Sequence, residues 1–292
     1  MGTLNDNQHA FHVNNKESLY DFRLRQAVNQ IYSTYGDVVS VEAKKKSLTK
    51  FGDNPSVSTA YETVAPWQGT EINETFVSTN LIDSVVSSST SDTTQTITVE
   101  GHTIDTSGNL TFVVQSVALT GRTETPLITP LARANRAYVA ASGTFNTTPA
   151  ALVGIVSIYD NTGGMASGVP SVAAATKLRI AAGDTQSQKC ATSVSSTDYW
   201  IITHASVDIG DTTGNAAFVT AQLEIRDVAN GGAWRPMGRV FTLWADQPGF
   251  DRAYNPYLIV PKNHDFRVSA KANANLAEVY ANVDGYLASV VT

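Results

Sequence analysis

Between about residue 70 and residue 292, the chain repeats short segments in which apolar residues alternate with small or polar ones. These segments are rich in Val, Ile, Thr, Tyr and Phe, and clusters of Gly, Asn, Asp and Pro separate them. The segments are Gln95–Glu100, Asn109–Leu119, Ala132–Ala141, Ala151–Tyr159, Tyr199–Asp208, Ala216–Arg226 and Glu278–Ala288. Alternation with period two, broken by turn residues, is typical of strands in all-β sandwiches and barrels. The pattern therefore predicts a mainly β protein with antiparallel β-sandwich or jelly-roll-like domains.

One segment near the N-terminus has the period of a helix instead, from Asn15 to about Tyr35. Its apolar side chains recur at steps of three and four residues, at Tyr20, Leu24, Ala27, Val28, Ile31 and Tyr35. Asn14 and Glu17 have the spacing of a capping box, and Gly36 is suited to the left-handed conformation that ends a helix. A single amphipathic helix must bury its stripe, either on its own β body or on a neighbouring subunit.

Three regions follow from these patterns. Residues 1–70 are expected to form an N-terminal arm that contains the helix, because the residues on either side of the helix lack sustained periodicity. Residues 71–185 and 186–292 are expected to form a first and a second β-sandwich region. The interface candidates on the arm are its apolar side chains, Tyr20, Leu24, Ile31, Phe51 and Trp67.

Composition narrows the possible partners. Charged residues make up 16% of the 292 residues, against a typical ~25%, and the net charge is −6. A polar but weakly charged surface suits permanent protein assemblies, while an acidic chain without a basic groove argues against nucleic acid. The one cysteine, Cys190, excludes an internal disulfide framework and fits synthesis in a reducing cytoplasm. Neither a signal peptide nor a membrane span is expected, since Met1–Asp6 opens no apolar run and no window approaches ~18 apolar residues.

Signatures of catalysis and cofactor binding are weak. The five histidines do not follow zinc-ligand spacing, and neither a P-loop, a dinucleotide fingerprint nor a nucleophile elbow occurs. We therefore expect neither an enzyme nor a cofactor. Asp208, Asp211 and Asn215 bring oxygen ligands together in a glycine-containing segment, which could hold calcium or could be an ordinary hairpin loop. Trp234, in a Gly-Gly-Ala-Trp-Arg-Pro turn, is the tryptophan most suited to an exposed sugar platform.

Several stretches together carry a family resemblance: Lys50–Pro55, Ala60–Val64, Gln95–Gly101, Ala118–Thr123, Leu131–Val139, Trp234–Arg235, Leu258–Pro261, Asp265–Val268 and Asp284–Leu287. They are spread over most of residues 50–290 and resemble virion structural proteins of tailed bacteriophages, in particular those of marine and cyanobacterial hosts. The segment Gly101–Asp105 departs from this pattern, in which the turn is more acidic. The resemblance implies a β-sandwich component of the particle, with no catalytic residues to carry over.

The leading hypothesis is a capsid decoration or cement protein, made in the host cytoplasm and incorporated into the virion. It would form a homotrimer and clamp neighbouring major capsid subunits, through the arm and through edge-strand pairing. One alternative places it in the tail or at the head–tail vertex, as an adaptor or fibre-anchoring protein. Another is a carbohydrate-binding module that uses Trp234 and residues 208–215. A β-helical or sandwich glycan hydrolase is the last alternative.

Overall fold

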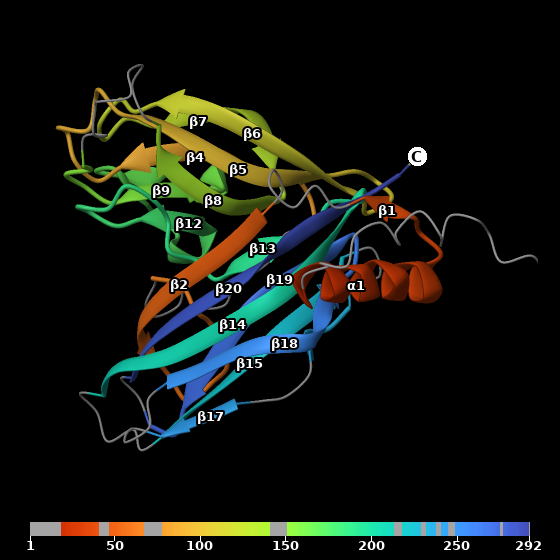
Figure 1. Ribbon diagram of the computed structural model, residues 1–292. Helices are drawn as coiled ribbons and strands as arrows, with labels where there is room; N and C mark the ends of the chain where they lie inside the picture. Colours follow the sequence, from red (N-terminus) through yellow and green to blue (C-terminus); the bar gives the residue numbers. More distant parts are fainter. Residues whose placement is uncertain are drawn as a thin grey trace, which may run out of the picture.

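The computed structural model describes residues 19–40, 47–66, 78–140, 151–212, 218–228, 232–237, 241–244, 249–274 and 277–291. Within them the chain is mainly β, every strand pair is antiparallel, and one helix lies near the N-terminus, which confirms the predicted fold class. The strands form two β bodies, shown in Figure 1 as a yellow-green upper part and a blue-cyan lower part.

The N-terminal body, which we define as β4 to β12, consists of two sheets that share one core. One sheet has the order β12 (Thr176–Ile180), β9 (Val156–Tyr159), β4 (Ile82–Ser87) and β7 (Thr125–Leu131). The other has the order β6 (Leu110–Ala118), β5 (Thr96–Ile104) and β8 (Arg133–Val139). A small hairpin of β10 (Met165–Ala166) and β11 (Val169–Pro170) and two 3-10 turns (Asn161–Gly163 and Ala173–Ala175) complete this body. Ile97 and Val99 of β5 and Val85 and Ile158 of the facing sheet are fully buried together.

The C-terminal body, defined as α1, β1 to β3 and β13 to β20, is also built from two sheets. In one, β20 (Ala277–Val290) pairs with β14 (Asp198–Thr212), which pairs with β18 (Gly249–Val260), while β1 (Val39–Ser40) and β2 (Ser47–Val57) pair with β20. In the other, β19 (His264–Ala272) pairs with β15 (Phe218–Asp227), with β13 (Ala191–Ser193) and with β3 (Glu62–Thr63). The short β16 (Arg235–Pro236) and β17 (Phe241–Trp244) pair with β15.

The two sheets of the C-terminal body meet in a core anchored by aromatic residues. Trp200 of β14 and Phe266 of β19 are completely buried, and their rings make an edge-to-face contact with centroids 4.8 Å apart. Edge-to-face packing directs the positive ring edge at the negative face of the partner, which adds to the area that both rings bury. The aromatic start of the strand at Tyr199 and Trp200 is therefore an anchor between the sheets.

Side-chain and backbone hydrogen bonds form the turn of the hairpin between β5 and β6. The carboxylate of Asp105 accepts hydrogen bonds from the backbone N–H groups of Ser107 and Asn109, both at 2.8 Å. Gly108 adopts a φ of +82°, which a side chain would make costly. These contacts fix the hairpin and carry its tip toward the C-terminal body.

The helix α1 (Leu19–Tyr35) ends where the sequence predicts, but it packs in cis. Gly36 takes a φ of +74° and donates its N–H to Tyr32 O at 2.9 Å, which closes the helix. Ala27 and Ile31 are buried in the core of the C-terminal body, and α1 lies against β18 (Figure 1). Just after the helix, Asp37 accepts hydrogen bonds from Tyr199 Oη at 2.5 Å and Lys262 Nζ at 2.6 Å. These bonds lower the pKa of Asp37, that from Lys262 most, and they fasten the helix end to its own body.

The expected arm at residues 1–70 differs from what the structure shows for its second half. β1 and β2 extend the sheet of β20, with Val39 opposite Val290 and Lys50 opposite Val283, and β3 extends the sheet of β19. Residues 39–40 and 47–63 thus belong to the C-terminal body. The sequence did not reveal this because the pairing of an edge strand depends on backbone hydrogen bonds to a distant segment, and it needs little apolar periodicity.

Replacing Ile31 with Ala should lower the free energy of unfolding by about 2–5 kcal/mol, because it leaves a cavity beneath the helix. The adjacent Tyr32 is 61% exposed, so Tyr32→Ala should change the stability by no more than about 0.5 kcal/mol. Urea unfolding of both variants checks this. Equal effects at the two positions would contradict the packing of α1 on its own body.

Candidate interaction site at the junction of the two bodies

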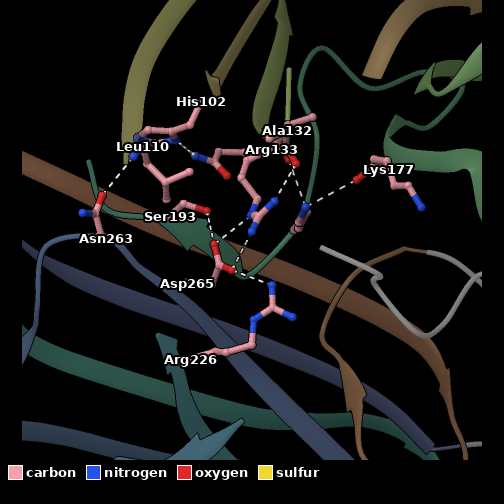
Figure 2. Close-up of polar contacts among 12 residues, drawn as sticks. His102, Leu110, Ala132, Arg133, Lys177, Ser193, Arg226, Asn263 and Asp265 are labelled. Carbon is pink, nitrogen blue, oxygen red and sulfur yellow. Dashed lines mark hydrogen bonds and ion pairs between the residues drawn. The ribbon is translucent and has the colours of Figure 1, made fainter. Parts of the chain in front are cut away.

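A buried carboxylate joins the two bodies. Asp265, the second residue of β19, is completely buried, and Arg133 of β8 reaches it from the N-terminal body (Figure 2). The guanidinium of Arg133 binds both oxygens, with Nε 2.9 Å from Oδ1 and Nη2 3.1 Å from Oδ2. Arg226 of β15 adds a contact of 2.7 Å to Oδ2, and Ser193 Oγ donates to Oδ1 at 2.6 Å. We refer to these four side chains as the Asp265 cluster.

The Asp265 cluster is costly to disrupt. An unpaired charge in a protein interior costs several kcal/mol, whereas bidentate guanidinium–carboxylate geometry offsets much of the desolvation. Because Arg133 and Arg226 come from different bodies, the carboxylate is fully paired only when the bodies are docked. The cluster therefore favours one relative position of the two bodies.

A second polar contact lies beside the cluster. Asn263, in the turn between β18 and β19, adopts a φ of +56° and accepts a hydrogen bond from Leu110 N at 2.9 Å. Its side-chain N–H donates to Asn109 Oδ1 at 3.1 Å, and Ser196 N donates to Leu110 O at 2.8 Å. The tip of the β5–β6 hairpin is thus held by the C-terminal body.

Two buried lysines also cross the junction toward β8. Lys50 Nζ donates to the backbone oxygen of Asn135 at 2.6 Å, and Lys189 Nζ donates to that of Ala134 at 2.9 Å. Burial, together with the nearby charge of Lys189, lowers the pKa of Lys50 to about 8. Backbone carbonyls of β8 thus accept hydrogen bonds from two buried ammonium groups at the junction.

His102 of β5 is buried on the N-terminal side of the same junction. Its Nδ1 is 2.8 Å from Asn135 Nδ2, and its ring lies 5.4 Å from that of Phe112, centroid to centroid. Burial lowers the pKa of His102 to about 4, so the imidazole is neutral at physiological pH. In the sequence His102 is one of five scattered histidines, and no local motif identified it as part of a contact between bodies.

A groove of about 770 Å³ opens along this junction. The C-terminal body contributes Ser47–Phe51 of β2, Thr192–Ser195, Asp198 and Leu287. The N-terminal body contributes Glu100, His102, Phe112, Asn135 and Arg136, and the segment that joins the two bodies contributes Gln186. Beyond Phe51, β2 meets the segment at Cys190 so closely that a Cβ on Gly52 would lie 2.5 Å from Cys190 N. The two chain segments are therefore in contact at Gly52 and Cys190. Ser47–Phe51, which precede this contact in β2, and Thr192–Ser195, which follow it in the other segment, line the groove.

The predicted interface residues fall in different environments. Ile31 is fully buried, and Leu24 packs against the same core, so neither offers a free anchor to a partner in this structure. Phe51 is half-buried and lines the groove. The side chain of Tyr20 and the whole of Trp67 lie outside the described residues.

The predicted calcium segment differs from the expected loop. β14 continues to Thr212, so Asp208 and Asp211 lie in a strand, while Asn215 and the side chain of Asp211 lie outside the described residues. Partial burial and the nearby Asp251 raise the pKa of Asp208. Among the described residues, no group of three His, Cys, Asp or Glu side chains is arranged to hold a metal ion.

Trp234 is not the open platform that the sequence suggested. Its ring is partly buried, with the guanidinium of Arg267 4.3 Å and that of Arg226 5.3 Å from its centroid. Arg267 in turn pairs with Glu224 at 2.7 Å. Both arginines therefore make cation–π contacts with the indole, and one of them, Arg226, also binds Asp265.

Comparisons with known proteins give no relative for this chain. No family model matches it, and no curated protein matches it. Two solved structures of infectious bursal disease virus show a low similarity. The Gx strain structure is 7% identical, with a TM-score of 0.16 over 86% of this chain and 73% of that chain. The Gt strain structure is 6% identical, with a TM-score of 0.12 over 88% and 78%. Similarity at this level does not establish a shared fold.

Within the described residues, no helix is long and apolar enough to cross a membrane.

Asp265→Asn should lower the free energy of unfolding by about 3–5 kcal/mol, because it leaves two guanidinium groups without their buried counter-charge. The matched control is Asp251→Asn on the open face of β18, where the side chain is 77% exposed and pairs with His204. Surface pairs contribute about 0–1 kcal/mol, so the control should unfold almost as the wild type does. Denaturant titration distinguishes the two, and a loss below about 1 kcal/mol for Asp265→Asn would refute the role of the cluster.

Proposed function

We propose that this chain is a structural subunit of a virus particle, and within the particle a capsid decoration or cement protein. The observation that carries the proposal is the Asp265 cluster, which couples two β bodies into one unit. A subunit that bridges others must transmit force between its contact surfaces without yielding at an internal hinge. Interfaces between domains are ordinarily small and permit relative movement of the domains. A buried, bidentate charge pair across this interface opposes that movement.

The N-terminal body carries apolar surface that suits contact with other subunits. Gln115 of β6 exchanges hydrogen bonds with the backbone of Thr129 on β7, at 2.8 and 2.9 Å, so these two edge strands lie side by side (Figure 1). Next to this pair Val114 and Ile128 are 53% and 79% exposed. Val153, Val169 and Val172 are further exposed aliphatic side chains of the same body. Apolar side chains on edge strands favour association when they are covered in an assembly.

The weakly charged composition and the resemblance to phage virion proteins support the same proposal. Under this proposal, the chain binds the major capsid protein or other virion proteins. It forms a homotrimer and catalyses no reaction. An adaptor in the tail or at the head–tail vertex would use the same rigid unit at lower copy number. The glycan-binding alternative is less well supported, since arginines engage the indole that it required.

Quantitative mass spectrometry of purified particles of the virus that encodes this chain tests the proposal. A decoration protein is expected at a copy number comparable to that of the major capsid protein. A few copies per particle would assign the chain to the tail or vertex instead, and absence from the particle would overturn a virion role.

A complementation assay tests the contact surface. Recombinant chain added to particles that lack it should restore occupancy, while Ile128→Glu should not, because a carboxylate would have to lose its hydration in the contact. Thr242→Glu, at an exposed position of β17 in the C-terminal body, is the matched control and should bind as the wild type does.

A further inference from the structure

The groove at the junction lies between strand edges of two different sheets. Within the described residues β2 pairs as a strand with β20 alone, and β13 with β19 alone. The second edge of β2 is contacted from Lys50 to Asp53, where Cys190 Sγ donates to Lys50 O and Asp53 N donates to Gln188 O, so its open part is Ser47–Thr49. Ser47–Phe51 of β2 and Thr192–Ser195, which includes the end of β13, line the groove as continuous segments. Free strand edges offer unpaired backbone N–H and C=O groups, and extended peptides are recognised by adding to such edges.

The remaining wall supplies apolar contact and comes from the N-terminal body. Phe112 is 51% exposed and its ring is held by the contact with His102. Leu48 and Phe51 of β2 are partly buried and line the same groove. The volume, about 770 Å³, is within the range of ~300–1,000 Å³ that is common for binding sites. The groove thus combines backbone edges with an exposed aromatic side chain, which suits side chains of a bound peptide.

The groove is lined by two basic and two acidic side chains, and the position within it that favours an anionic group is Lys50. The ammonium of Lys50 carries three N–H donors and has one hydrogen-bond acceptor among the described residues, the backbone oxygen of Asn135. Lys189 and Arg136 are further cations near it, and Glu100 is the nearby anion. The carboxylate of Glu100 pairs with Arg136 at 3.7 Å, and that of Asp198, also on the wall, accepts hydrogen bonds from Ser195 and Ser289. Neither carboxylate accepts a hydrogen bond from Lys50.

A bound carboxylate would offset the desolvation of the buried Lys50 ammonium. The depressed pKa of this lysine shows that its present surroundings disfavour the charged form. A carboxylate within hydrogen-bond distance would add acceptors and a counter-charge, and charge-assisted bonds of this kind are stronger than neutral ones. The cost of the buried ammonium in the free protein would then be recovered on binding.

We propose that this groove binds an extended peptide segment of a partner protein, with a carboxylate side chain of the peptide paired to Lys50. The inference deepens the proposed function, since it names the surface and the partner chemistry of an assembly protein. A peptide is favoured over an acidic sugar because continuous strand edges line the groove. Its test uses the isolated chain, so its failure leaves the copy number of the chain in particles untouched.

A random peptide display library selected on the immobilised full chain tests the proposal. Enriched peptides should share an Asp or Glu flanked by residues suited to extended structure. Fluorescence anisotropy with a synthetic peptide should show a loss of affinity of roughly 30-fold or more for Lys50→Met, the effect expected when a buried charge pair loses one partner. Replacing the acidic residue of the peptide with its amide should cause a similar loss.

Two variants separate binding from folding. Lys189→Met removes the other buried ammonium, which is directed at the carbonyls of Ala134 and Lys177 and does not line the groove, so it should weaken peptide binding much less than Lys50→Met does. Phe112→Ala alters an exposed side chain at little cost in stability and should still weaken binding. Hydrogen–deuterium exchange should show that the peptide protects Ser47–Phe51.

Three results would overturn the proposal. The first is a selection that enriches no peptide, or enriches peptides without an acidic residue. The second is equal affinity of Lys50→Met and the wild type for an enriched peptide. The third is a glycan array in which acidic glycans bind and Lys50→Met abolishes the signal, while peptides do not bind, which would assign the groove to sugars.

Discussion

The arrangement of this protein depends on the burial of one carboxylate, that of Asp265. A carboxylate with no exposed surface must have its lone pairs occupied, and here two arginines and a serine do so. Arg226 belongs to the same body as Asp265, but Arg133 belongs to the other. Separation of the bodies would remove Arg133 and its two hydrogen bonds from the carboxylate and leave Arg226 and Ser193 as its partners.

The buried lysines at the junction have consequences beyond the Asp265 cluster. Lys50 and Lys189 end on backbone oxygens of β8, to which their ammonium groups donate hydrogen bonds. His102 remains neutral in the same region because burial opposes its protonation. The Asp265 cluster is therefore our explanation for the docking of the bodies, and the buried ammonium of Lys50 is the basis of the anion site that we propose in the groove.

The sequence predicted what local patterns encode and missed what distant contacts decide. Alternation identified the segments that overlap β5, β6, β8, β9, β14, β15 and β20, and Gly36 marked the end of the helix. The pattern also identified the apolar stripe of the helix, but nothing in it could tell whether Ile31 packs on its own body or on a neighbour. β2 pairs with a strand more than two hundred positions later, and Arg133 meets Asp265 across 132 positions. Contacts of this kind leave no periodic signal, which is why the groove and the Asp265 cluster could not be predicted.

The rigidity of the two-body unit is most directly measured by the distribution of distances between the bodies. Spin labels on cysteines at Ile128 and Thr242, exposed positions of the two bodies, would report it by double electron–electron resonance. The native Cys190 is buried, its pKa is raised to about 12 by burial, and it should stay unlabelled. The account predicts one narrow distance distribution that broadens when Asp265 is replaced by Asn. A broad distribution in the wild type, or a narrow one that the substitution leaves unchanged, would contradict it.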